Sequence, residues 1–382
     1  MSHFSVLVLG NNVEEQLAPY HEFECTGVDN EFVQDIDITE KVKEELAKNT
    51  VSMYRDPTGE LHDKYSNKFY REPTAEEVET IGLAGTGSNG TLSWTSNDWN
   101  DGKGYRTMIH FCPEGWQKEE IKNTASLIEF AESWHGLKAT TILDLNTEDA
   151  HKYGYCLVDQ ANEVIKIIKR TNPNSKWDYW RIGGRWAGML KLKPGTTHHS
   201  PPNYGWEFKH DGIPVREGKY TDQAKKANID FIGIKAKARE NALKKYDQVH
   251  KLINFNQDFI TWAEIDKEDI KKAREQYGKQ SLIKEWNATA QSATDQELRE
   301  IFVWDRPDEY TCEREHYAKL AEDAASRTFA IVKDGKWFEK GEMGWWATVS
   351  GEKDEETWNS IFWNMINNSP DDTLITVVDC HI

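Results

Sequence analysis

The sequence predicts an α+β protein whose sheet, mixed or antiparallel, contains both chain termini. The chain opens with the apolar run 4–9 and closes with the β-branched run 374–378, and both patterns are typical of central strands. Between these runs, hairpin and helix signals alternate without the strict strand–helix rhythm of a parallel α/β fold. If the two runs share one sheet, the segments between them are layers or insertions on that sheet.

Two hairpins are expected inside the chain. Residues 153–158 and 163–168 are strand-like runs around a short polar turn. Residues 328–332 and 337–338 flank Asp334-Gly335, a dipeptide that readily supplies the positive φ angles of a type I′ turn. Residues 186–192 are a further strand candidate.

Apolar residues at helical spacing predict helices packed on this sheet. The best pattern runs from Trp358 to Ile366 after the acidic start 354–356. Two more helices are expected over 117–134, ending at Gly136, and over 236–254. We therefore expect residues 1–220 to form the first part of an α+β core, 221–325 a mainly helical insertion, and 326–382 the part that completes the core with the C-terminal strand.

Composition indicates a soluble, cytoplasmic protein. The 382 residues are 38% hydrophobic and 29% charged, the formal net charge is −18, and no apolar run approaches the roughly 18 residues of a membrane span. The N-terminus has no signal-peptide pattern. The five cysteines are widely spaced without a CxxC pair, which favours free thiols in a reducing compartment.

The charge is concentrated at the two ends of the chain. Residues 1–100 carry 19 acidic and 7 basic side chains, and residues 301–382 carry 17 and 8. Because duplex nucleic acid is bound mainly by neutralising its phosphates, this distribution argues against nucleic-acid binding. The acidic ends are interpreted either as solvated surface or as a mimic that docks onto a basic host protein.

Several segments resemble a family of uncharacterised proteins from bacteriophages and bacteria. The resemblance rests on the opening MSHFSVLVLG, the block GTGSNGTLSWTSNDWNDGKGY, the run RTNPNSKWDYWRIGGRWAGMLKLKPG, the hairpin KWFEKGEMGWW and the ending PDDTLITVVDCHI. It spans nearly the whole chain. It implies a phage or mobile-element origin and an accessory role, and it supplies no activity, cofactor or catalytic residue.

Residues 85–90 match the pattern GxGxxG. A dinucleotide site needs a strand before this pattern and a helix after it, so that the pyrophosphate meets a helix N-terminus. Here the strand and turn formers of residues 91–98 follow. A flexible glycine loop is therefore the better interpretation.

The segment 177–186 is the most unusual in the chain. Aromatic faces beside arginines can hold a base or a sugar ring, and paired glycines let a ligand or another backbone approach closely. The alternative is that the tryptophans cap the core and the arginines stack on them or pair with Asp178. The candidate ligand-binding residues are Trp177, Trp180, Arg181, Gly183, Gly184, Arg185 and Trp186.

Three residues are candidates for proton transfer. Glu342 lies between tryptophans, where apolar rings would raise the pKa of its carboxyl group. Asp379 and His381 end the C-terminal strand, close to where His3 is expected. Half-sites for a metal, such as His110 with Cys112 and Cys312 with His316, lack a second pair at motif spacing, so no metal is assigned.

Two functions follow from these patterns. The first is a phage or mobile-element accessory protein that binds a host protein or a small ligand. The second is an enzyme acting on a nucleotide or sugar derivative in a cleft lined by tryptophan and arginine. The cofactor, the oligomeric state and whether His3, Cys380 and His381 form a site stay open at this point.

Overall fold

The computed structural model describes residues 3–77, 87–89, 92–97, 106–200, 202–203, 219–344 and 348–382. The chain forms two compact units. Unit 1 combines Met1–Thr26 with Asn174–Ile382, and unit 2 is Gly27–Pro173. Both contain helices and sheets, so the expected α+β class is confirmed.

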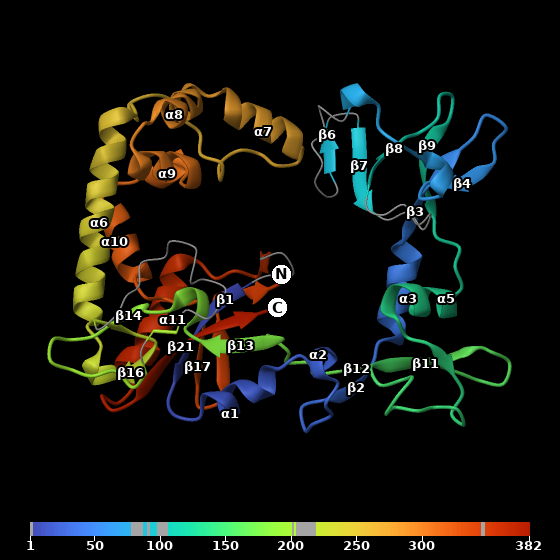
Figure 1. Cartoon of the computed structure of the whole chain (residues 1–382), viewed down its shortest axis with the longest axis horizontal. Coiled ribbons are helices and arrows are strands. Elements are labelled where there is room, and N and C mark those ends of the chain that lie inside the picture. Colours follow the sequence, from blue (N-terminus) through green and yellow to red (C-terminus); the bar gives the residue numbers. More distant parts are fainter. Residues whose placement is uncertain are drawn as a thin grey trace. The chain divides into compact units, whose positions relative to one another are not determined.

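A six-stranded mixed sheet forms the centre of unit 1 and contains both ends of the described chain (Figure 1). Its order is β13-β21-β1-β17-β18, and β16 also pairs with β21. The pairing of β1 with β17 is parallel and the other pairings are antiparallel. The strands are β1 (His3–Leu9), β13 (Tyr179–Ile182), β16 (Gln223–Lys225), β17 (Ala330–Lys333), β18 (Lys336–Glu339) and β21 (Leu374–His381).

The two terminal strands share this sheet, as the sequence predicts, and the structure makes them direct neighbours. Their antiparallel register runs from His3 opposite His381 to Leu9 opposite Ile375. Because side chains alternate along a strand, Leu7 and Val377 face one side of the sheet and the neighbouring valines face the other. Both sides are buried, which explains why these runs are apolar throughout.

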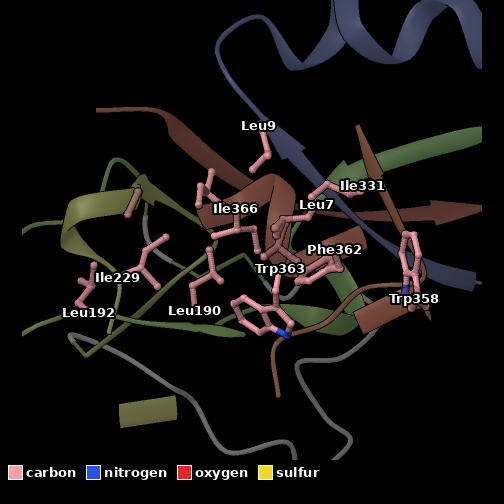
Figure 2. Packing of buried hydrophobic residues seen from close by; sticks show 13 residues of the cluster. Leu7, Leu9, Leu190, Leu192, Ile229, Ile331, Trp358, Phe362, Trp363 and Ile366 are labelled. Carbon is pink, nitrogen blue, oxygen red and sulfur yellow. The ribbon is translucent and has the colours of Figure 1, made fainter. Parts of the chain in front are cut away.

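One helix, α11 (Glu355–Asn367), covers the first face of this sheet. The side chain of Asp354 caps it by accepting a hydrogen bond from the backbone N–H of Thr357. Figure 2 shows Trp358, Phe362 and Ile366 of this helix packed with residues of the sheet. The expected amphipathic helix is therefore present. The indole of Trp358 is fully buried and donates a hydrogen bond to the carbonyl of Thr328.

The opposite face is covered by α1 (Val13–Leu17), η1 (Ala18–Tyr20) and the segment before β13. Val13 and Leu17 pack on valines of β1 and β21. The β17–β18 hairpin closes this side, and Asp334 and Gly335 have φ angles of 52° and 70°. The turn therefore has the positive φ angles expected of Asp-Gly.

The range 231–324 of unit 1 is mainly helical. The long helix α6 runs up one side of unit 1, and α7, α8 and α9 lie at its far end (Figure 1). Tyr246, Val249 and Trp286 are among the residues of a separate apolar cluster here. The helices are α6 (Phe231–Leu252), α7 (Ile270–Lys279), α8 (Ser281–Ser292), α9 (Gln296–Trp304), η5 (Pro307–Tyr310) and α10 (Arg314–Ala324). The division at residues 220 and 325 stays a prediction.

Short connecting elements complete unit 1. They are α2 (Phe23–Thr26), η3 (Gly184–Trp186), β14 (Leu190–Lys191), β15 (Tyr220–Thr221), η4 (Lys226–Asn228), β19 (Glu342–Met343) and β20 (Val349–Ser350). The expected strand over 186–192 is thus reduced to β14. Gly183, Gly184 and Gly188 all have positive φ angles, which turn the chain before a longer strand can form.

The described residues of unit 2 form three small sheets, and one of them contains the hairpin β11–β12 that the sequence predicts. Val42 of α3 and Phe130 of α5 pack with Ile167 of β12 in its core. The elements are β2 (Gln34–Asp37), α3 (Thr39–Lys48), β3 (Thr50–Arg55), β4 (Leu61–Asp63), η2 (Asn67–Phe69), β5 (Tyr70–Arg71), β6 (Gly87–Asn89), β7 (Leu92–Asn97), β8 (Arg106–His110), β9 (Gln117–Lys122), α5 (Leu127–His135), β10 (Ala139–Thr140), β11 (Gly154–Val158) and β12 (Val164–Thr171).

The expected helix over 117–134 is wrong in its first half. Residues 117–122 form β9, which pairs with β3 over six residues. The helix α5 begins later because Ser126 and Glu129 form a capping box. It ends where expected, at Gly136, whose φ angle is 68°. Within the described residues no helix is both long and apolar enough to cross a membrane.

Trp358→Ala should lower the free energy of unfolding of unit 1 by about 3–5 kcal/mol, because it removes a fully buried ring and leaves the carbonyl of Thr328 without its donor. Trp304→Ala is the matched control. That ring is 81% exposed, so its removal should change stability by less than about 0.5 kcal/mol. Urea unfolding followed by far-ultraviolet circular dichroism measures both. Equal losses of stability in the two variants would show that the packing of Trp358 on the sheet does not stabilise unit 1.

Candidate functional site

A cluster of polar side chains lies where the two chain ends meet, on the α11 side of the central sheet. Three neighbouring strands contribute to it, because His381 is opposite His3 of β1 and also opposite Tyr179 of β13. Arg181 is opposite Asp379 in the same way. The side-chain alternation of period two places these residues on the face that carries Leu7 and Val377 further along the strands.

His3 and Asp379 form the first histidine–carboxylate pair. Nδ1 of His3 is 2.8 Å from Oδ1 of Asp379, and its Nε2 is 3.2 Å from the hydroxyl of Tyr179. Asp379 has no solvent exposure, and the His3 side chain is nearly buried. These two residues are 376 positions apart in the sequence, so only the pairing of β1 with β21 brings them together.

His381 and Asp178 form the second pair. Nδ1 of His381 is 2.7 Å from both carboxylate oxygens of Asp178. The backbone also joins them, because the N–H of Asp178 donates to the carbonyl of His381. Nε2 of His381 has no hydrogen-bond partner among the described residues, and it is not one of the enclosed polar atoms. One nitrogen of this ring is thus anchored, and the residue as a whole is 5% exposed.

The aromatic rings of the cluster are in direct contact. The ring centroids of His3 and His381 are 4.8 Å apart in an edge-on arrangement. The Tyr179 ring stacks on His381 at 4.6 Å with an interplanar angle of 19°. The open question whether His3 and His381 meet is therefore answered: they do. Cys380 lies between two of these residues in the chain but faces the opposite side, where burial raises the pKa of its thiol.

A backbone N–H and an arginine side chain face the buried carboxylate of Asp379. The backbone N–H of Arg185 donates to Oδ2 at 3.0 Å, and Nε of Arg181 is 3.6 Å from the same oxygen. A buried carboxylate is tolerated only when such donors compensate its lost hydration. The carboxylate therefore acts as a fixed acceptor, which orients the His3 ring.

The glycine pair Gly183-Gly184 has a structural cause. A Cβ at Gly184 would lie 2.3 Å from Oδ2 of Asp379, and a Cβ at Gly183 would lie 2.1 Å from Oδ2 of Asp222. Asp222 is also fully buried, and its carboxylate accepts hydrogen bonds from the N–H groups of Gly188 and Asn203, both at 2.5 Å. The groups that lie close to these glycines are thus the carboxylates of Asp222 and Asp379, where a ligand or another backbone was the expectation.

The structure divides the predicted aromatic and arginine site between two faces. Trp177 and Trp180 pack in the cluster on the far side of the sheet, and the indole of Trp177 donates to the carbonyl of Leu17. Trp186 packs against the core on the α11 side, and Arg185 is exposed. Arg181, Gly184 and Arg185 are therefore the members of that segment that meet Asp379.

Glu342 is exposed at the start of β19. No hydrogen bond or ion pair among the described residues joins it to the histidine cluster. Its sequence neighbours Trp345 and Trp346 lie outside the described residues. Tyr179 is the member of the cluster to which the sequence patterns give no role of its own. Tyr179 and Arg181 alternate at strand spacing, which is the signal that places them on one face.

The metal half-sites are separate in the structure. His110 contacts the carbonyl of Lys64, while Cys112 lies beyond the end of β8. Cys312 precedes α10 and so does not share a helix with His316. Of the glycine loop 85–90, residues 87–89 form β6, and β7 follows as a strand. Gly85, Thr86 and Gly90 lie outside the described residues.

One group in unit 2 has metal-ligand chemistry: Asp56, Glu60 and His62, whose ligand atoms lie within 4.8 Å of one another. Hydrogen bonds from Thr58 and His62 hold the pKa of Asp56 well below its usual range. The other ring nitrogen of His62 accepts from Lys68. These atoms already stabilise the turn between β3 and β4, so we assign the group a structural role.

Comparisons with known proteins add no identification. No protein family, curated protein or solved structure matches this chain. The resemblance to uncharacterised phage and bacterial proteins stays a prediction, and the function must be argued from the site itself.

Gly184→Ala should destabilise the protein by more than the strain of a positive φ angle alone. The new methyl group would collide with Asp379, whose position is fixed by buried hydrogen bonds. Gly335→Ala is the control, because it has a φ angle of 70° and no atom within 4 Å of the added Cβ. We expect Gly335→Ala to lower the free energy of unfolding by about 1–2 kcal/mol. Gly184→Ala should lower it by at least about 1 kcal/mol more. Urea titrations that give equal losses would contradict this packing.

Asp222 should make the stability depend on pH in a defined direction. Burial raises its pKa above the usual 3.8, although two backbone N–H groups oppose the shift. The folded state therefore binds the proton more tightly, and the stabilisation is fully present below pH 3.8 and is lost as pH rises through the raised pKa. Compared with Asp222→Asn, the wild type should gain stability between pH 7 and pH 4. If the difference in free energy of unfolding between the wild type and Asp222→Asn stays constant from pH 7 to pH 4, this prediction is wrong.

Proposed function

We propose that the protein is an enzyme that uses His3 and His381 as an acid–base pair on a phosphate ester of a nucleotide or sugar derivative. The observation that supports this most is the contact of two imidazole rings, each oriented by its own carboxylate. A histidine–carboxylate pair is common as a structural element, whereas two in ring contact, with one nitrogen that has no hydrogen-bond partner among the described residues, suit proton transfer.

The orientation of each ring follows from its partner. Carboxylates accept hydrogen bonds, so Asp379 and Asp178 favour the tautomers that carry the proton on Nδ1. Nε2 of His3 then faces the hydroxyl of Tyr179, and Nε2 of His381 has no hydrogen-bond partner among the described residues. Displacement at phosphorus needs a base for the attacking oxygen and an acid for the leaving oxygen. One neutral and one protonated imidazole supply both.

A guanidinium group close to the pair supports an anionic substrate. Nε of Arg181 is 3.6 Å from Oδ2 of Asp379, beside the contact of Asp379 with His3. Guanidinium groups bind phosphate oxygens well because their N–H groups match the geometry of the anion. We therefore place a phosphate group of the substrate on the side of Arg181.

A binding function is the second candidate. The acidic ends of the chain favour a host protein with a basic surface, and phage origin, cytoplasmic location and host binding stay predictions. The two candidates differ in one respect. Only the enzyme requires that both histidines affect the turnover of a small molecule.

Hydrolysis of bis(4-nitrophenyl) phosphate and of 2′,3′-cyclic nucleotides tests the enzyme. We expect a bell-shaped dependence of kcat/KM on pH, because one imidazole must be neutral and the other protonated. His3→Ala and His381→Ala should each lower kcat/KM by about 100-fold or more. His316→Ala, at an exposed histidine of α10, is the control and should leave the rate unchanged. Turnover that survives both cluster substitutions would overturn the proposal.

A further inference from the structure

We propose that Tyr179 is the covalent nucleophile of this site, an inference that rests on the proposed acid–base function. Its hydroxyl is 3.2 Å from Nε2 of His3, and Nδ1 of His3 is 2.8 Å from Oδ1 of Asp379. These contacts connect three side chains in the order hydroxyl, imidazole, carboxylate. A nucleophile, its base and the group that orients the base have this order in hydrolases of unrelated folds.

The direction of the hydrogen bonds follows from the carboxylate. Asp379 accepts, so Nδ1 of His3 donates to it. Nε2 of the neutral ring is then an acceptor, and the hydroxyl of Tyr179 must be the donor. The proton of the phenol already points along the path to the base. A nucleophile must donate its proton to the base, and this is the direction of the hydrogen bond from Tyr179 to His3. A purely structural contact would work equally well in either direction.

Tyr179 is both accessible and held in place. Its side chain lies at the start of β13, the edge strand of the sheet, and the residue is 41% exposed. The ring stacks on His381 and meets His3 edge-on, with 5.8 Å between centroids. The residue is thus partly exposed while its ring is held by two histidine contacts, as attack from a preorganised site requires.

The reaction has two steps that balance. The oxygen of Tyr179 attacks phosphorus and its proton passes to Nε2 of His3, while the bond to the leaving oxygen breaks and protonated His381 gives that oxygen its proton. In the second step water attacks the phosphotyrosine and gives a proton to His381. The bond between phosphorus and the Tyr179 oxygen breaks, and His3 returns the proton to that oxygen. The net change is hydrolysis of one phosphate ester bond.

Covalent labelling tests the nucleophile without knowledge of the substrate. Phenylmethanesulfonyl fluoride forms an oxygen–sulfur bond with an activated hydroxyl and releases fluoride, while the proton leaves through the base. Peptide mass spectrometry of the full-length protein gives the rate at every tyrosine. We expect Tyr179 to react at least tenfold faster than Tyr65. Tyr65 is the matched internal control because it is more exposed, at 63%, so exposure alone would favour it.

Variants separate activation from simple access. His3→Gln should slow the labelling of Tyr179 at least tenfold and leave the rate at Tyr65 unchanged in the same sample. That internal rate also shows that unit 2 is intact, and far-ultraviolet circular dichroism checks the fold of unit 1. Equal rates at Tyr179 and Tyr65, or a rate at Tyr179 that does not respond to His3→Gln, would overturn the nucleophile.

A further variant distinguishes failure of the nucleophile from failure of the proposed acid–base function. Tyr179→Phe should abolish turnover of bis(4-nitrophenyl) phosphate. If this variant still turns the ester over and the reaction still needs His3 and His381, the acid–base function stands and the covalent step is wrong. If Tyr179 is labelled selectively and no phosphate ester is cleaved by the wild type, the activated tyrosine stands and the phosphate ester is the wrong substrate class.

Discussion

The pairing of β1 with β21 is the constraint on which the rest of unit 1 depends. Without it the first and last strands would each lack a neighbour, and α11 would have no continuous apolar face to cover. The loop that this pairing closes spans almost the whole chain, so its entropy cost is large and must be offset by burial on both faces. The apolar residues of both strands, Leu7 and Val377 among them, provide that burial.

The same register creates the polar cluster as the two strands reach the chain ends. A shift of β21 by one residue against β1 would place Cys380 opposite His3 and turn Asp379 to the other face of the sheet. The packing of Gly184 against Asp379 adds a second constraint, since it fixes the carboxylate that orients His3. The geometry of the cluster is therefore set by the fold and not by local flexibility.

The sequence could predict the sheet and its terminal strands because their patterns are local: an apolar run, an Asp-Gly turn and a helix with the spacing of Trp358, Phe362 and Ile366. It could not predict the cluster in the same way. Whether His3 lies opposite His381 depends on a register between strands at the two ends of the chain. The segment 117–122 was assigned to a helix because its pairing with β3 is likewise invisible in a single stretch of sequence.

A buried histidine–carboxylate pair can be a purely structural device, since a satisfied polar network specifies strand register in a core. His3 with Asp379 would fit that role if it were alone. Two observations set the cluster apart. Tyr179 extends the network to a hydroxyl on an exposed residue, and His381 keeps Nε2 without a partner among the described residues although its other nitrogen is anchored. A purely structural network gains little from an exposed member, because an exposed polar group is already satisfied by water. The exposed residue Tyr179 is what the proposed nucleophile requires, and we place the proposed chemistry here for that reason.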